Sequence, residues 1–199
     1  MIPPVIEARQ ALTIANDGFE QRLRAVRPED WGRATLCTEW DVRALVNHVV
    51  GGGVRYTMLL HGATPEEVEA TRALDHLGDE PVASFITTAE QVEAAFAEEG
   101  ALERTVRHRT GERTGRELLG MRVVDVAVHG WDLAVAIGGD ETIAPDTVEF
   151  LLYLSPDLEG GRRAGAFAQP VGESPIGASL QGRLLHMVGR DAAAAGRAS

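Results

Sequence analysis

The chain has 199 residues, of which 44% are hydrophobic and 25% charged, as is typical of one globular domain with or without a small appendage. Its formal net charge of −11 argues against nucleic acid or an anionic membrane surface as the main partner, because both need a basic footprint. The lone Cys37 excludes an internal disulfide. With no signal-peptide pattern and no apolar run long enough to span a bilayer, we expect a cytoplasmic protein.

Apolar residues at helical spacing predict a first helix over residues 4–25, ended by Pro28. The second is expected to begin at a capping box formed by Thr38 and Asp41 and to run to about residue 60. It contains Gly51, Gly52 and Gly53, each of which costs about 1 kcal/mol relative to Ala in a helix. Such a run indicates close approach of another helix or of a ligand, and helix packing is the commoner reason.

A short helix over residues 65–74 and an amphipathic helix over residues 80–99 follow. Residues 105–110 alternate and can turn at Gly111, which predicts an extended segment or small hairpin. A long central helix is expected over residues 115–137, stopped by Gly138 and Gly139.

The C-terminal part is expected to hold helices over residues 144–154 and 178–188, separated by a Gly- and Pro-rich connection, and a fraying tail over residues 190–199. The pattern predicts an all-α fold, with four main helices, short accessory helices and one small extended segment. We expect residues 1–140 to form the bundle and residues 141–199 to form a helical extension packed on it.

The central helix carries the polar groups that point to chemistry. Asp125, His129 and Asp132 fall on one narrow face, and residues four apart lie about 5–6 Å from each other. With His48 from the second helix, Asp125 and His129 make a two-histidine, one-carboxylate set that suits Zn²⁺, Ni²⁺ or Fe²⁺ and leaves coordination positions open. Asp132 would then orient an imidazole from outside the coordination sphere, or pair with an arginine. The simpler alternative is a core histidine hydrogen-bonded to a nearby aspartate.

Other constellations are weaker. The chain has no Gly-x-Ser-x-Gly elbow, no dinucleotide fingerprint, and no phosphate loop in its Gly-rich connection. Cys37 lies near a helix N-terminus, which can lower the pKa of a thiol, and could pair with a histidine as a nucleophile. Most lone cysteines of this kind are inert.

Two separated motifs carry a family resemblance. Trp31 followed by the run from Cys37 to Gly52, and downstream the run from Asp125 through His129 to Ala134, resemble actinobacterial metal-binding proteins of the DinB/YfiT-like superfamily. These proteins are related to the N-terminal domain of mycothiol-dependent maleylpyruvate isomerase. The resemblance extends to Pro170-Val171 and the ending around residues 183–191, and so covers most of the chain.

The resemblance implies a DinB-like four-helix bundle whose metal ligands fall on His48, Asp125 and His129, with Zn²⁺ the usual ion. It also implies that the metal activates a low-molecular-weight thiol such as mycothiol toward an electrophile. The sequence departs from the isomerase in having Asp125 where that enzyme has Glu. In place of that enzyme's separate C-terminal domain, only the short segment of residues 141–199 follows the bundle.

The leading hypothesis is a mycothiol-dependent transferase or isomerase-like enzyme whose partners are a small thiol and an electrophile. The alternatives are a metal-binding bundle without turnover, and a metal-free bundle that binds an apolar ligand. The sequence leaves open whether the chain forms a homodimer.

Overall fold

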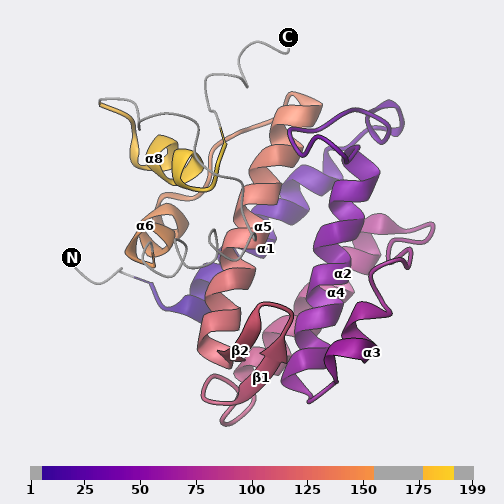
Figure 1. The fold of residues 1–199 in the computed structure, drawn as a ribbon. Coiled ribbons are helices and arrows are strands. Elements are labelled where there is room, and N and C mark those ends of the chain that lie inside the picture. Colours follow the sequence, from indigo (N-terminus) through magenta and orange to yellow (C-terminus); the bar gives the residue numbers. More distant parts are fainter. Residues whose placement is uncertain (1–5, 155–176, 191–199) are drawn as a thin grey trace.

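The computed structural model describes residues 6–154 and 177–190. Four long helices form the bundle: α1 (Ala8–Arg24), α2 (Val42–Leu60), α4 (Pro81–Ala97) and α5 (Gly115–Ile137). Both α1 and α2 pack against α4 and α5, so the four helices enclose one core (Figure 1). The expected all-α fold with four main helices is confirmed.

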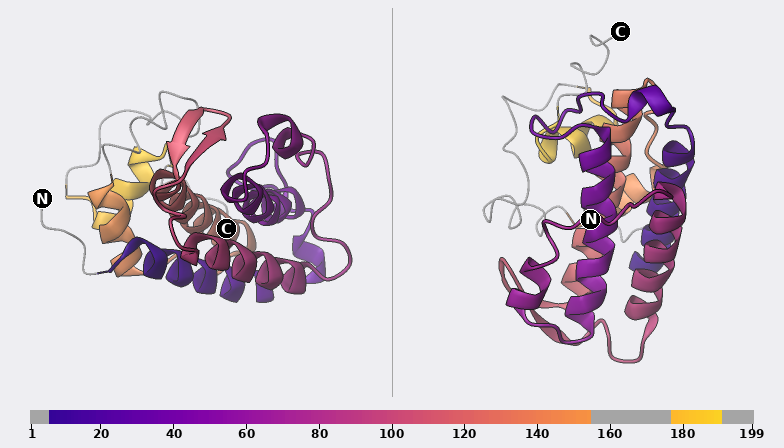
Figure 2. Two further views of the ribbon diagram at one scale, coloured as in Figure 1. Left: turned by 90° about the horizontal axis from the view of Figure 1, so that it is seen from below. Right: turned by 90° about the vertical axis from the view of Figure 1, so that its right-hand side faces the viewer.

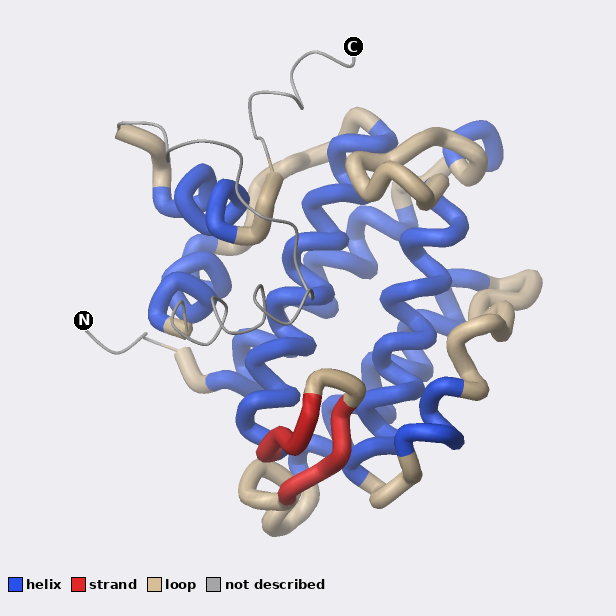
Figure 3. The backbone as a smooth tube through the Cα atoms, viewed as in Figure 1, coloured by secondary structure: helices blue, strands red, loops and turns tan. Residues whose placement is uncertain are grey.

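Shorter helices and two strands lie outside the four-helix bundle. They are the 3-10 helix η1 (Pro28–Asp30), the helices α3 (Pro65–Glu69), α6 (Pro145–Tyr153) and α8 (Leu180–Met187), and the strands β1 (Thr105–His108) and β2 (Gly111–Thr114). The strands pair antiparallel, with Thr105 opposite Thr114 and His108 opposite Gly111. The hairpin is the predicted extended segment, and it lies beside the start of α5 (Figure 3).

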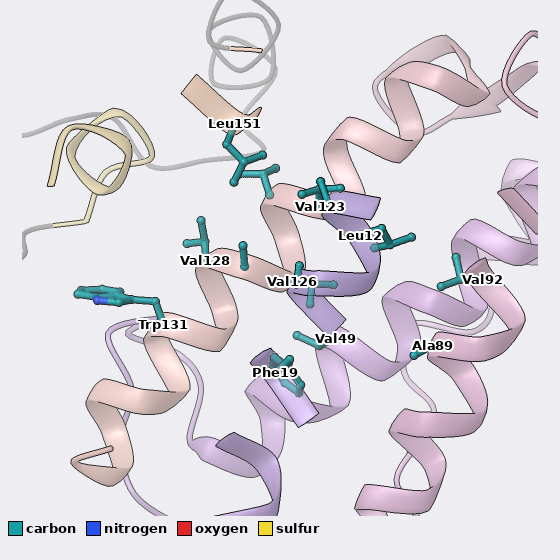
Figure 4. Close-up of a cluster of buried hydrophobic side chains, with 14 of the residues drawn as sticks. Leu12, Phe19, Val49, Ala89, Val92, Val123, Val126, Val128, Trp131 and Leu151 are labelled. Atoms are coloured by element: carbon teal, nitrogen blue, oxygen red, sulfur yellow. The ribbon is translucent and has the colours of Figure 1, made fainter. Parts of the chain in front are cut away.

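The core is built from aliphatic and aromatic side chains of all four long helices. Phe19 of α1 stacks on Phe85 of α4 with ring centroids 4.8 Å apart, and Val49 and Val126 bring α2 and α5 into the same cluster (Figure 4). Helix α5 is buried on most sides, as its continuous run of Val, Ala and Leu predicts. A polar group on its inner face must therefore find a partner inside the protein.

The N-terminus of α2 differs from the prediction. Asp41, and not Thr38, is the N-cap, and its side chain accepts a hydrogen bond from the Ala44 amide. The prediction that Thr38 caps the helix is wrong because residues 37–40 form a turn before Asp41. In this turn the Trp40 amide donates a hydrogen bond to the Cys37 carbonyl. The displaced cap leaves residues 37–40 as a loop above the helix.

Other helix boundaries are close to those predicted. Helix α1 begins at Ala8, and α3 ends at Glu69, so the predicted helix over residues 65–74 is too long at its end. Gly138 ends α5 in the left-handed conformation, with φ of 67°, as the expected glycine stop requires.

The C-terminal helices lie on one side of the bundle. Helix α6 packs on α1 and α5, and α8 packs on α6 (Figure 2). Residues 155–176, which make up most of the predicted connection, and residues 191–199 of the predicted tail lie outside the described residues. No helix in the described part of the chain has the length and apolar character needed to cross a bilayer.

Candidate metal centre and its cavity

A cavity of about 600 Å³ opens between α2 and α5. Its lining includes the loop at residues 37–40, α3 and the hairpin. The loop lies at the start of α2, and α3 and the hairpin lie near the other end of that helix (Figure 1). His48, Asp125 and His129 all line it. The fold thus places the polar face of α5 on a solvent-accessible space and not in a sealed core.

The structure brings together the three side chains that the sequence analysis selected. Asp125 Oδ1 lies 3.2 Å from His48 Nε2 and 3.5 Å from His129 Nε2. One ligand atom from each residue lies within 4.8 Å of the other two. Spacing on α5 places Asp125 beside His129, whereas only the packing of α2 on α5 adds His48.

These distances fit a divalent ion. Two ligand atoms bound tetrahedrally at about 2.0–2.1 Å are about 3.3 Å apart, close to both separations from Asp125 Oδ1. The donor set of two imidazoles and one carboxylate is one that zinc and other transition metals accept. A fourth position would face the cavity, since all three side chains line it.

Arg122 holds the other oxygen of Asp125. Its Nη1 donates to Asp125 Oδ2 at 2.8 Å, and its side chain is only 1% exposed. A Cβ at Gly52 would lie 2.7 Å from that Nη1, and one at Gly53 would lie 3.4 Å from Nη2 and 2.5 Å from Thr88 Cγ2. The glycine run therefore makes room both for helix packing and for this buried guanidinium. Because Arg122 binds Oδ2, the other oxygen of Asp125, Oδ1, is the one that faces the two histidines.

Asp132 positions His129 from the opposite side. Asp132 Oδ2 lies 3.0 Å from His129 Nδ1, so a neutral His129 that donates from Nδ1 presents the lone pair of Nε2 to the cavity. Arg190 donates to both Asp132 oxygens at 2.8 Å. Asp132 thus contacts an imidazole and an arginine at the same time.

Cys37 lies against the same group. Its Sγ is 3.5 Å from Asp132 Oδ2 and 3.9 Å from His129 Nδ1. Cys37, His129 and Asp132 form a second set with ligand-type atoms within 4.8 Å of one another. This set is the poorer metal site, because both carboxylate oxygens of Asp132 already accept from Arg190.

Trp40 forms one wall of the site. Its ring centroid lies 4.5 Å from that of His48 and 5.7 Å from that of His129. The loop that the displaced helix cap creates places this indole against the two imidazoles, at distances typical of packed aromatic rings.

Burial and close charges set the protonation of the metal-free site. Burial lowers the pKa of His48 more than Asp125 raises it, so this imidazole is neutral at pH 7. Burial also lowers the pKa of His129, but hydrogen bonds with Asp132 and Cys37 outweigh it and raise the value to about 10. Burial raises the pKa of Asp125, yet its hydrogen bond with His48 and the positive charges of His129 and Arg122 hold it well below its usual range. Metal binding would displace the His129 proton.

The sequence analysis did not identify the two arginines that pair with the site's aspartates, Arg122 and Arg190. Arg122 could have been found, because it precedes Asp125 by three residues on one helix face. Arg190 gave no such signal, since it lies 58 residues from Asp132 and meets it only through the fold.

Fold and site together define a class of protein: a helical bundle with two histidines and an aspartate converging on an open cavity. Residues 12–134 match the family model described as the mycothiol maleylpyruvate isomerase N-terminal domain. The chain belongs to this family.

Sequence relatives and solved structures agree with this assignment. The uncharacterised protein Rv0738 of Mycobacterium tuberculosis H37Rv, and its counterpart MT0763 from strain CDC 1551, are each 33% identical to this chain over 151 residues, covering 76% of this chain and 79% of theirs. The crystal structure of the mycothiol-dependent maleylpyruvate isomerase aligns with a TM-score of 0.57 at 20% identity, over 77% of this chain and 70% of its own. A single-residue mutant of that isomerase aligns with a TM-score of 0.59 at 18% identity, over 85% and 75%. At these identities the structural likeness establishes the fold.

Proposed function

We propose that the protein binds a divalent metal ion, with Zn²⁺ favoured over Ni²⁺ and Fe²⁺, and uses it in a reaction of a low-molecular-weight thiol, most plausibly mycothiol, with a small electrophile. The observation that carries the proposal is the convergence of His48 Nε2, Asp125 Oδ1 and His129 Nε2 on a cavity of about 600 Å³. A space of this size accommodates a small-molecule ligand. The family's mycothiol-dependent member supports the choice of thiol.

In this proposal, His48, Asp125 and His129 hold the ion, and Asp132 keeps His129 in the tautomer that binds through Nε2. When bound, the metal would supply Lewis acidity, which lowers the pKa of a thiol and favours the nucleophilic thiolate. Trp40 packs against both imidazoles. The reaction would take place in the cytoplasm.

The alternative function is a bundle that binds a metal or a small ligand without turnover. The same ligand geometry supports it, because three convergent side chains do not distinguish binding from catalysis. Turnover of an electrophile in the presence of mycothiol, measured by loss of free thiol, separates the two.

Metal content tests the site itself. Protein purified without chelator should carry close to one transition-metal ion per chain by elemental analysis. His48→Ala and His129→Ala should each fall well below one, with the helical circular dichroism signal retained, because the apolar core and not the site holds the bundle. His61→Ala is the matched control, since His61 pairs with Glu98 outside the cavity. Wild-type protein that takes up no metal, even on incubation with Zn²⁺, would refute the proposal.

A further inference from the structure

The cavity is rich in positive charge, although the chain has a net charge of −11. Its lining includes three carboxylates (Glu39, Glu69 and Asp125) and five arginines (Arg55, Arg72, Arg107, Arg109 and Arg190). Two of these arginines already have partners, because Arg190 pairs with Asp132 and Arg72 with Glu69 at 2.6 Å. The other three have no ion-pair partner among the described residues.

Arg55 is the most unusual of these three. Its residue is 8% exposed, and its one hydrogen bond within the described chain is from Nη2 to the His48 carbonyl at 3.3 Å. Burial lowers its pKa to about 10, which still leaves it charged at pH 7. A guanidinium has five donors, so most of the donors of Arg55 are not used by the described residues. A buried cation without a carboxylate costs free energy unless a ligand supplies the negative charge.

The hairpin adds two more cations at this end of the cavity. Arg107 and Arg109 flank His108, and all three residues line the space. Burial, followed by the charges of Arg109 and other nearby arginines, lowers the pKa of His108 to about 4. The charges of these arginines thus add to burial in keeping His108 neutral at pH 7. Cross-strand Glu112, which faces Arg107 in the register, forms no ion pair with it in the described structure.

Arg55 lies on the same helix as the candidate metal ligand His48, which gives the distance between the hairpin end of the cavity and the candidate metal centre. Arg55 follows His48 by seven residues, so the two lie on one face of α2 and are separated by about 10.5 Å along its axis. His48, Gly52 and Arg55 all line the cavity, so both ends of this stretch of α2 border one continuous space. A ligand bound at the arginines therefore shares that space with the candidate metal ligands.

We propose that Arg55, with Arg107 and Arg109, forms a binding site for the anionic group of a small ligand, a carboxylate or a phosphate, at the hairpin end of the cavity. Guanidinium groups bind both anions through paired hydrogen bonds. If the site anchors the electrophile of the proposed reaction, that electrophile is an anion, and this part of the inference rests on the proposed function. The binding of an anion at these arginines does not itself depend on the metal.

The test uses full-length protein freed of metal by chelator, so that no anion can bind an ion directly. Succinate, inorganic phosphate and the neutral analogue succinamide are titrated by calorimetry at constant ionic strength. At least one anion should bind ten or more times more tightly than succinamide. Arg55→Gln and Arg109→Gln should each weaken that binding by about tenfold, the scale of a lost hydrogen bond to a charged group.

Arg116→Gln is the matched control, because it also removes one positive charge near the hairpin but lies outside the cavity lining. It should change affinity less than twofold. If Arg55→Gln does not fold, Arg107→Gln and Arg109→Gln alter exposed side chains and carry the test alone. The proposal is overturned if neither anion binds more tightly than succinamide, or if the cavity variants weaken binding no more than Arg116→Gln. Because metal is absent, neither result affects the metal proposal.

Discussion

Replacing Gly52 by Ala tests whether the glycine run of α2 exists to seat the buried guanidinium behind Asp125. Helix propensity alone predicts that Gly→Ala inside a helix stabilises the protein by about 1 kcal/mol. The structure predicts the opposite sign. The new Cβ would lie 2.7 Å from Arg122 Nη1 and 3.3 Å from Asp125 Oδ2, and the first distance is shorter than packing allows.

The guanidinium is enclosed by the protein and cannot swing out into solvent. Arg122 is fully buried, and shifting its Nη1 away from the Cβ lengthens the 2.8 Å hydrogen bond to Asp125. Disrupting a buried ion pair costs about 3–5 kcal/mol. After subtraction of the propensity gain of about 1 kcal/mol, Gly52→Ala should destabilise the metal-free protein by about 2–4 kcal/mol. Asp125 would also lose its fixed orientation, so bound metal should decrease.

Urea unfolding in the presence of chelator measures the stability change, and elemental analysis after mild chelation measures the loss of metal. Gly182→Ala in α8 is the matched control, because its Cβ would make only ordinary contacts of 3.4–3.5 Å and should be neutral or slightly stabilising. If Gly52→Ala were as stable as the wild type and retained metal equally well, the reasoning about Arg122 would be refuted.

Three other predictions follow from the same structure. Asp125→Glu should retain metal, whereas Asp125→Asn, which removes the charge, should weaken metal binding by about 10- to 100-fold in a competition titration; equal affinities would remove Asp125 from the ligand set. Adding mycothiol to the cobalt-substituted protein should produce a sulfur-to-metal charge-transfer band, and an unchanged spectrum would contradict thiol binding at the metal. Hydrogen bonds from Arg27 hold the pKa of Asp30 below its usual range, so the stability this carboxylate provides is present above about pH 4 and is lost in acid. Asp30→Asn should therefore be less stable than wild type at pH 7 by urea unfolding, and the difference should shrink as the pH falls below 4; a difference independent of pH would rule out this explanation.

Much of the fold is readable from local sequence. The periodicity of apolar residues locates the four long helices, because a helix in a bundle must bury one stripe every 3.6 residues. The glycine at position 138 ends α5 because a left-handed residue is needed there. Helix ends are less certain where capping residues compete, and at α2 the turn at residues 37–40 makes Asp41 the cap in place of Thr38.

In the candidate site, too, some contacts follow from local sequence and others only from tertiary packing. Asp125, His129 and Asp132 share a face of one helix, so their proximity follows from helix geometry and could be predicted from the sequence alone. The sequence also offered His48 as a candidate, but its 3.2 Å approach to Asp125 depends on how α2 packs against α5. Only the tertiary structure shows that the hairpin arginines share a cavity with Arg55, because side chains so distant in the chain meet through packing, which leaves no local pattern.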